Sequence, residues 1–297
     1  MRAGDGNNDI EVGGGDNQVY AGRGSDDVTA GGGDDRIEVG DGRNTVSAGD
    51  GDNRVVTGRD SDRIAAGRGD DTVYAGGGDN RVAAGSGDNY VSAGSGRDTI
   101  SGGSGDDTVY AGDGSNRVSA GNGDNLVSSG SGSDTIEAGR GDDTVRAGDG
   151  NNDIEVGGGD DQVYTGRGND TVDAGSGDNR IETGSGNDRV VAGSGRDTIR
   201  AGSGDNRVAA GSGDNYVSAG SGRDTISGGS GDDTVYAGDG SNRVSAGNGD
   251  NLVSAGSGST RSRRAAATTR CGPATATTTS MWAAATTRSM RAGAATT

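Results

Sequence analysis

The sequence predicts an all-β solenoid, a right-handed parallel β-roll in which two nine-residue units form each coil of 18 residues. Three observations predict this fold class. The pattern Ala-Gly-x-Gly-x-Asp/Asn-x-Val/Ile-x returns every nine residues throughout residues 2–258. Its first glycine recurs from Gly4 to Gly256, (256 − 4)/9 + 1 = 29 times without a miss. Its apolar position, from Ile10 to Val253, is only ever valine or isoleucine. So strict a period is typical of one supersecondary unit stacked many times.

Each unit divides into a turn and a short strand. Counting the alanine as position one places the glycines at positions two and four, Asp or Asn at six, and Val or Ile at eight. Residues 103–107, Gly-Ser-Gly-Asp-Asp, have no β propensity, and their two glycines suit a tight turn that visits positive φ. Thr108, Val109 and Tyr110 then form a strand whose central valine points inward. Two turns and two strands close one flattened coil, so about 28 units form about 14 coils.

The composition argues against a globular core of ordinary thickness. Hydrophobic residues make up 27% of the 297 residues, phenylalanine is absent, and there are 65 glycines. Without regard to order, so few large apolar side chains would indicate disorder. The regular spacing of every valine and isoleucine in the repeats favours instead a thin solenoid, whose narrow core is a column of β-branched side chains.

The charge favours cation binding and argues against nucleic acid as a partner. Asp+Glu number 45 against 27 Lys+Arg, which gives a formal net charge of −18. Six arginines follow the last acidic residue, Asp250, so the repeats alone carry about 21 − 45 = −24. Such a surface repels nucleic acid and anionic membranes and attracts cations; simple solubility is the alternative interpretation. With no histidine and one cysteine, Cys271, we expect neither a disulfide framework nor the usual zinc sites. No hydrophobic run is long enough to span a bilayer.

The full pattern Gly-Gly-x-Gly-x-Asp-x-U-x, where U is a large apolar residue, occurs at residues 102–110 and 228–236. In these residues the chain resembles the RTX (repeats-in-toxin, haemolysin-type) calcium-binding nonapeptide-repeat family. The resemblance covers nearly all of residues 2–258, although most units carry alanine at position one. It implies a parallel β-roll that folds when several calcium ions bind between neighbouring turns, usually in a secreted, extracellular bacterial protein. It also implies the type I secretion machinery as a partner of the intact parent protein.

The sixth position supplies the candidate calcium ligands. Calcium takes about six to eight oxygens from carboxylates and backbone carbonyls, and a glycine turn can aim carbonyls inward while each Asp adds charge. The candidate ligands are Asp26, Asp35, Asp62, Asp71, Asp98, Asp107, Asp134, Asp143, Asp161, Asp170, Asp188, Asp197, Asp224 and Asp233, together with Asn44, Asn53, Asn80, Asn89, Asn116 and Asn125.

Asp and Asn alternate at the sixth position. If successive units lie on opposite edges of the roll, one edge reads Asn8, Asp26, Asn44, Asp62, and the other reads Asn17, Asp35, Asn53, Asp71. The alternation slips only around Asp143/Asp161 and Asp170/Asp188. Like charges about 5 Å apart would repel by about 3 kcal/mol at an effective dielectric near 20, and alternation removes that repulsion when no ion is bound. The hypothesis is that one Asp and one Asn hold each ion, which makes single sites weaker and the roll less dependent on calcium. The alternative is that a 36-residue block was duplicated and the alternation was merely inherited.

The period ends at residue 258, and residues 259–297 predict a disordered tail because they have no apolar period to bury. Residues 264–270, Arg-Ala-Ala-Ala-Thr-Thr-Arg, are what codons for Ala-Gly-Arg-Gly-Asp-Asp-Thr can encode when read one base late. The tail is therefore interpreted as repeat sequence in a shifted reading frame. Residues 2–4 match residues 146–148, so the chain is interpreted as a piece of a longer array whose effector domain and export signal lie elsewhere.

These observations predict a non-enzymatic, calcium-binding repeat module of a secreted bacterial protein. Low cytosolic calcium would leave the acidic repeats unfolded and exportable, and millimolar external calcium would fold them. One alternative is a structural or adhesive extracellular solenoid, including an ice-binding one, although the mixed residues at position three count against it. Another is the targeting module of a secreted enzyme whose catalytic domain is missing. A monomer is expected, with end-to-end association of uncapped coils as a second option.

Overall fold

The computed structural model describes residues 1–263, 270–271 and 279–281. These described residues form strands and turns and contain no helix. The chain divides into two compact units, Met1–Gly157 and Gly158–Thr297, and each of them is a parallel β-solenoid. The predicted fold class, a parallel β-solenoid with 18 residues per turn, is confirmed.

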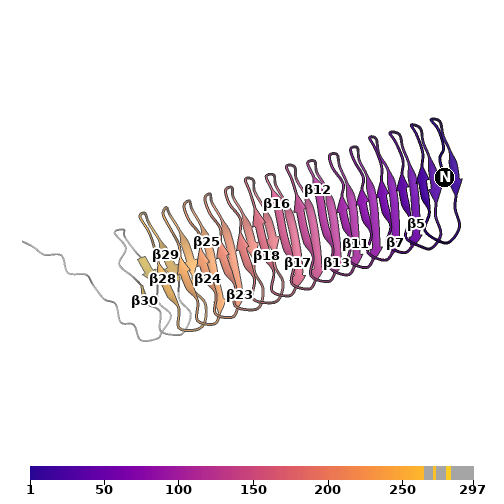
Figure 1. Cartoon of the computed structure of the whole chain (residues 1–297). Coiled ribbons are helices and arrows are strands. Elements are labelled where there is room, and N and C mark those ends of the chain that lie inside the picture. The colour runs from indigo at the N-terminus through magenta and orange to yellow at the C-terminus, as the bar shows by residue number, and fades with distance from the viewer. Residues whose placement is uncertain (264–269, 272–278, 282–297) are drawn as a thin grey trace, which may run out of the picture. The chain divides into compact units, whose positions relative to one another are not determined.

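The first unit contains two parallel sheets, one built from odd-numbered strands and the other from even-numbered strands. Its odd-numbered strands are β1 (Asp9–Glu11), β3 (Asp27–Thr29), β5 (Thr45–Asp50), β7 (Arg63–Arg68), β9 (Arg81–Ser86), β11 (Thr99–Ser104), β13 (Arg117–Asn122), β15 (Thr135–Arg140) and β17 (Asp153–Gly158). Its even-numbered strands are β2 (Gln18–Tyr20), β4 (Arg36–Glu38), β6 (Arg54–Val56), β8 (Thr72–Tyr74), β10 (Tyr90–Ser92), β12 (Thr108–Gly112), β14 (Leu126–Ser129) and β16 (Thr144–Gly148). In Figure 1 these strands, indigo to magenta, stand side by side, and the chain turns at both ends of the strands.

The second unit repeats this arrangement. Its even-numbered strands are β18 (Gln162–Thr165), β20 (Arg180–Glu182), β22 (Thr198–Arg200), β24 (Tyr216–Ser218), β26 (Thr234–Tyr236), β28 (Leu252–Ser254) and β30 (Arg270–Cys271). Its odd-numbered strands are β19 (Thr171–Asp173), β21 (Arg189–Val191), β23 (Arg207–Ser212), β25 (Thr225–Ser230), β27 (Arg243–Ser245), β29 (Arg261–Arg263) and β31 (Thr279–Met281). Each strand pairs in parallel with the next strand of its own sheet.

The strand register fixes the length of the coil. Val91 of β10 pairs with Val73 of β8 on one side and with Val109 of β12 on the other, each 18 residues away. At about 14 turns of 18 residues, the same position of the unit therefore stacks on itself from coil to coil. This stacking places identical side chains in columns, and those columns determine what the turns can bind.

The interior contains more than the predicted column of valine and isoleucine. Position eight is buried as expected, with Val109 0% and Ile100 1% exposed. The alanines of position one, such as Ala111 at 0% exposed, are equally buried, because side chains two residues apart on a strand share a face. Position six is also inside: Asp107 is 1% and Asn89 2% exposed. Three inward columns therefore line the solenoid, and one of them is acidic.

Position four is where the turn requires glycine. Gly105 lies in the left-handed region at φ +114°, and a Cβ built on it would collide with the carbonyl oxygen of Gly87 in the preceding coil. Among the described residues, Asp60 is the one non-glycine residue with positive φ, at 82°. Left-handed backbone costs an ordinary residue about 1–2 kcal/mol, and aspartate is one of the few that visit it.

The predicted disorder of residues 259–297 falls mostly on residues outside the described part and stays a prediction. Within the described part, Arg261 of β29 pairs with Arg243 of β27. Thr260 and Ser262 stand at positions six and eight of the same period and are 4% and 5% exposed. The strand ladders thus include a few residues beyond residue 258, with hydroxyl groups in place of the usual aspartate and valine.

Candidate metal centre

Every candidate ligand at the sixth position lies immediately before a strand, with its side chain buried in the solenoid. Asp107, for example, precedes β12, and Asn80 precedes β9. Their exposed fractions lie between 0% and 3% for the whole set: Asp26, Asp35, Asp62, Asp71, Asp98, Asp107, Asp134, Asp143, Asp161, Asp170, Asp188, Asp197, Asp224, Asp233, Asn44, Asn53, Asn80, Asn89, Asn116 and Asn125. Within each unit they form two columns, one at the turns from odd to even strands and one at the turns from even to odd strands.

Hydrogen bonds join the sixth positions of adjacent coils. The N–H of Asn89 donates to Oδ1 of Asp107 at 2.9 Å, and the N–H of Asp107 donates to Oδ1 of Asn125 at 3.0 Å. Oδ1 of Asp and Oδ1 of Asn thus play the same part, each accepting the N–H of the residue 18 positions earlier. Because the two side chains have the same shape, this ladder does not distinguish them.

The second side-chain atom distinguishes them. Nδ2 of Asn44 donates to the carbonyl oxygens of Gly40 and Gly42, at 3.0 and 2.9 Å, which are positions two and four of its own turn. Nδ2 of Asn80 donates to the carbonyls of Gly78 at 3.1 Å and of Ala93 at 3.2 Å, the latter at position one of the next coil. Backbone carbonyl oxygens of positions one, two and four therefore converge on the place beside the sixth side chain.

An aspartate presents an oxygen instead of an amide nitrogen to these carbonyls. The buried Oδ2 has no hydrogen-bond partner in Asp26, Asp35, Asp62, Asp71, Asp98, Asp107, Asp134, Asp188, Asp197, Asp224 and Asp233. A buried polar atom without a partner is costly, and a buried carboxylate more so. The aspartate turns thus present an unpartnered anionic oxygen where an asparagine turn presents an amide donor. At the turns of Asp62, Asp134 and Asp188, a hydroxyl at position one donates to the position-one carbonyl of the next coil.

The surroundings of Gly102 locate this oxygen. A Cβ built on Gly102 would meet both Oδ2 of Asp107 and the carbonyl oxygen of Ala120, and it would collide with them. Gly228 has the same relation to Asp233 and Ala246. The carboxylate oxygen and the position-one carbonyl of the next coil therefore both lie beside the Cβ position of position one, which an alanine occupies in most units.

Burial changes the acidity of these carboxyls. It raises the pKa of Asp71, Asp98 and Asp197 to about 6, against the opposing effect of the backbone N–H bond from Asn53, Asn80 or Asn179. Burial likewise raises the pKa of Asp62, Asp107, Asp134, Asp188, Asp224 and Asp233. A raised pKa means that the folded chain disfavours the charged form unless a cation or a proton is supplied.

The donors that the structure brings together at an aspartate turn are a carboxylate and several backbone carbonyls. Over residues 1–263, 270–271 and 279–281, no three His, Cys, Asp or Glu side chains gather into a metal-binding group. Calcium is the cation that suits such a donor set, because it takes carboxylate and carbonyl oxygens in flexible geometry at about 2.3–2.6 Å. The residues at the aspartate turns therefore fit calcium by their chemistry.

A second acidic column at the fifth position was missed by sequence reasoning. At the odd-to-even turns of the first unit the fifth residue is always aspartate and exposed: Asp16, Asp34, Asp52, Asp70, Asp88, Asp106, Asp124 and Asp142. The N–H of Asp124 donates to Oδ1 of Asp106 at 2.7 Å, so this ladder runs opposite in sense to that of the sixth position. The opposite edge has Ser25, Arg43 and Ser61 at equivalent places. Aspartate at every eighteenth residue was the signal that could have revealed it.

The fifth-position column acts on the buried one through charge. Asp88 and Asp106 add to the effect of burial in raising the pKa of Asp107. A cation near Asp107 is attracted by these exposed carboxylates as well as by Asp107 itself.

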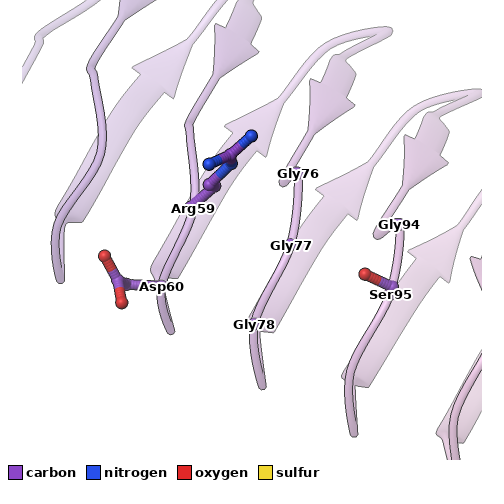
Figure 2. A pocket seen from close by; sticks show the side chains of 7 residues that line it. All are labelled: Arg59, Asp60, Gly76, Gly77, Gly78, Gly94 and Ser95. Atoms are coloured by element: carbon purple, nitrogen blue, oxygen red, sulfur yellow. The ribbon is translucent and has the colours of Figure 1, made fainter.

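A surface hollow lies near the one break in the glycine pattern. It measures about 550 Å³ and is lined by Arg59, Asp60, Gly76, Gly77, Gly78, Gly94 and Ser95. Figure 2 shows that Arg59, Asp60 and Ser95 are the lining residues that carry side chains, and that the first two point away from each other. The hollow exists because three consecutive glycines project nothing into it, and its charged groups are exposed. It offers no converging set of ligands.

Comparison with known proteins agrees with this geometry. A family model described as RTX calcium-binding nonapeptide repeat (4 copies) matches residues 2–37, 29–64, 56–91, 92–127, 128–163, 156–190, 164–199, 182–217, 191–226 and 227–260. A search of curated proteins found no match. Among the described residues, no helix is long and apolar enough to cross a membrane.

Proposed function

The chain belongs to the RTX calcium-binding nonapeptide repeat family, and we propose that it is a non-catalytic module of a secreted protein that binds several calcium ions and folds on them outside the cell. The family supports calcium as the ligand. The proposal adds to this ligand the export of the chain, its folding on calcium, and the residues that hold the ions. The type I secretion machinery is its proposed partner during export.

The observation that carries the proposal is the buried, unpartnered Oδ2 of sixth-position aspartates such as Asp71, Asp98 and Asp107. In our proposal the ligands are these carboxylates and the carbonyl oxygens of positions one, two and four around them. When bound, calcium supplies the positive charge that these oxygens lack. The same role is proposed for every buried aspartate of the sixth position: Asp26, Asp35, Asp62, Asp71, Asp98, Asp107, Asp134, Asp143, Asp161, Asp170, Asp188, Asp197, Asp224 and Asp233.

Folding on calcium follows from the same arrangement. The unfolded chain has no converging carbonyls, so calcium binds mainly the folded state and stabilises it by mass action. Without calcium, the folded state must bury carboxylates whose charge is not neutralised, which opposes folding. Low calcium inside a cell would then keep the chain extended for export, and millimolar calcium outside would favour the solenoid.

A calcium titration of the purified chain followed by far-UV circular dichroism tests the proposal. We expect the β signal to be weak in chelator and to grow with calcium, while the same concentration of magnesium gives little, because magnesium demands stricter octahedral geometry and gives up water reluctantly. A β signal that is complete in chelator and unchanged by calcium would contradict folding on calcium. A random coil in excess calcium would overturn the whole proposal.

A pair of matched variants tests which residues hold the ions. The first replaces sixth-position Asp35, Asp71 and Asp107 with Asn, and the control replaces the preceding fifth-position residues, Asp34, Asp70 and Asp106, with Asn. Both remove the same charge from the same turns. Equilibrium dialysis should show about three ions lost from the first variant and none from the control. Equal losses would assign the ions to the surface charge instead.

A further inference from the structure

We infer that the sixth-position asparagines take the place of ions: a turn that carries Asn is closed by its own side-chain amide, and this chain binds calcium only at the turns that carry Asp. The inference rests on the proposed calcium function and specifies which turns of the solenoid take part in it. It differs from a site that one Asp and one Asn share.

The comparison of Asn44 with Asp62, one coil apart in the same column, carries the first step. They are 2% and 3% exposed, and their backbone N–H groups make equivalent bonds: Asn44 to Oδ1 of Asp62 at 2.8 Å, and Asp62 to Oδ1 of Asn80 at 3.0 Å. Burial and backbone bonding are therefore matched. What differs is the second atom of the side chain, an amide nitrogen in one and a carboxylate oxygen in the other.

The second step concerns the carbonyl oxygens of the turn. Nδ2 of Asn44 lies within hydrogen-bond distance of the Gly40 and Gly42 carbonyls, so its two N–H groups satisfy the acceptors that would otherwise ligate an ion. At Asp62 the corresponding Oδ2 has no hydrogen-bond partner, so the carbonyl oxygens of Gly58 and Asp60 receive no donor from the sixth side chain. The position-one carbonyl of the next coil, that of Ala75, accepts the hydroxyl of Thr57 instead, at 2.8 Å. The amide thus makes, without charge, the contacts that a cation makes at an aspartate turn.

The third step excludes an ion from the asparagine turns. For an Asn to ligate calcium it must offer Oδ1, but Oδ1 of Asn80 already accepts the N–H of Asp62 at 3.0 Å. Its Nδ2 points at the carbonyls of Gly78 and Ala93, and a cation there would face N–H groups. The amide cannot rotate to expose its oxygen without losing all three hydrogen bonds.

The alternation of Asp and Asn along a column reduces charge repulsion and the number of ions needed. Adjacent coils lie about 4.8 Å apart, so placing Asn between two Asp residues doubles the spacing of neighbouring buried carboxylates. Except at the adjacent pairs Asp143/Asp161 and Asp170/Asp188, each aspartate turn is flanked by turns that need no ion, and these can hold their shape while calcium is scarce. The chain needs fewer ions to fold than a solenoid with Asp in every turn.

Two reciprocal variants of the full chain test the inference. One replaces Asn44, Asn80 and Asn116 with Asp, and the other replaces Asp62, Asp98 and Asp134, which alternate with them in the same column, with Asn. A control replaces Ser61, Ser115 and Ser133 with Asp, which adds three carboxylates at the fifth position of the same column, in the turns of Asp62, Asn116 and Asp134. Bound calcium is counted by equilibrium dialysis, and folding is followed by circular dichroism from chelator to millimolar calcium.

We expect the Asn-to-Asp variant to bind about three further ions and to need more calcium to fold, with a steeper dependence on calcium concentration. The Asp-to-Asn variant should bind about three fewer ions and be more folded than the unmodified chain in chelator. The control should change neither the number of tightly bound ions nor the folding in chelator.

The inference is overturned if the Asn-to-Asp variant folds in calcium without gaining ions. A loss of about six ions from the Asp-to-Asn variant would also overturn it, because shared sites would then be lost on both sides of each substitution. An unmodified chain that binds no calcium defeats the proposed function instead. In that case, the inference that the asparagine amide closes its turn is tested by the stability of the Asp-to-Asn variant in chelator. A variant no more stable than the unmodified chain would overturn it.

Discussion

Two interior columns of the solenoid, the eighth-position spine and the sixth-position ladder, are buried to the same degree but differ in what they require. Val109 is 0% and Asp107 1% exposed, two residues apart on the same turn of chain. The valines and isoleucines of the spine need only close packing to be stable, because apolar side chains have no polar atoms that require a hydrogen-bond partner. The Asp and Asn residues of the ladder are stable in the interior only where each polar side-chain atom has a hydrogen-bond partner or a bound cation. The comparison teaches that the spine fixes the topology, while the ladder sets the conditions under which that topology is stable.

The largest effect is expected from the spine, and it should not depend on calcium. Ile100 is 1% exposed and pairs with Val82 and Val118. Replacing Ile100 with Ala should cost about 2–5 kcal/mol through lost burial and a cavity. Urea unfolding at low and at saturating calcium should give the same loss, and Ser101→Ala, at the exposed neighbour, should cost little. A loss confined to low calcium would break the distinction between the two columns.

The second largest effect is expected when an asparagine turn of the ladder is converted into an aspartate turn. Asn80→Asp removes the amide donor to the carbonyls of Gly78 and Ala93 and puts a third successive buried carboxylate between Asp62 and Asp98. At low calcium this should cost about 3 kcal/mol, the order expected for an unpaired buried charge. At saturating calcium most of the loss should be recovered. Urea unfolding at the two calcium concentrations measures the difference; equal losses at both would contradict it.

Two adjacent aspartates, where the alternation of Asp and Asn is broken, allow the opposite substitution to be tested. In the second unit Asp170 is followed one coil later by Asp188, whose Oδ1 accepts the Asp170 N–H at 2.9 Å. Burial and the charge of Asp170 both raise the pKa of Asp188. Asp188→Asn separates Asp170 from the next aspartate of the column, Asp224, and should stabilise the chain at low calcium by about 2 kcal/mol, since it removes one like-charge pair. Thermal unfolding in dilute calcium provides the measurement, and a lower stability than the unmodified chain would refute the expectation.

The smallest expected effect per residue is the change in folding stability with pH. Burial raises the pKa of Asp71, Asp98 and Asp197 to about 6 in the folded chain, above the ordinary value of 3.8. The folded state therefore binds more protons than the unfolded state between pH 4 and 6, and stability falls as pH rises through about 6. Between pH 7 and 5 each such carboxyl should add about 1.4 kcal/mol at low calcium.

Saturating calcium should abolish or reverse that trend, because protons and calcium compete for the same oxygens. Urea midpoints at pH 5, 6 and 7, in dilute and in saturating calcium, separate the two cases. A series in dilute calcium in which stability rises with pH would show that these carboxylates are not buried as charged groups in the folded chain.

The spine could be predicted from the sequence because its signal is local and repeated. Val or Ile at every ninth residue determines which side chains face inward, and the two-unit coil follows from the need to bring like positions together. The register of Val91 with Val73 and Val109 confirms that coil. The buried alanines of position one, such as Ala111, follow from the same period-two rule.

The ladder could be predicted only in part. The sequence identified the sixth-position residues and their alternation, but residue identity does not tell which atom of Asn80 meets a carbonyl and which accepts an N–H. Those contacts depend on the backbone carbonyls of Gly78 and Ala93, which every residue type possesses and which no pattern of side chains reveals. The acidic fifth-position column from Asp16 to Asp142 was visible at a period of 18, yet a search at a period of nine mixes it with the serines and arginines of the opposite edge.

The most direct measurement is the number of calcium ions held by the unmodified chain at saturation, counted by native mass spectrometry or equilibrium dialysis. If asparagine replaces the ion in half of the turns, the count should approach ~14, one for each buried aspartate of the ladder. A count near ~28, one for every turn of the array, would contradict this account, and a count of zero would remove calcium from it altogether.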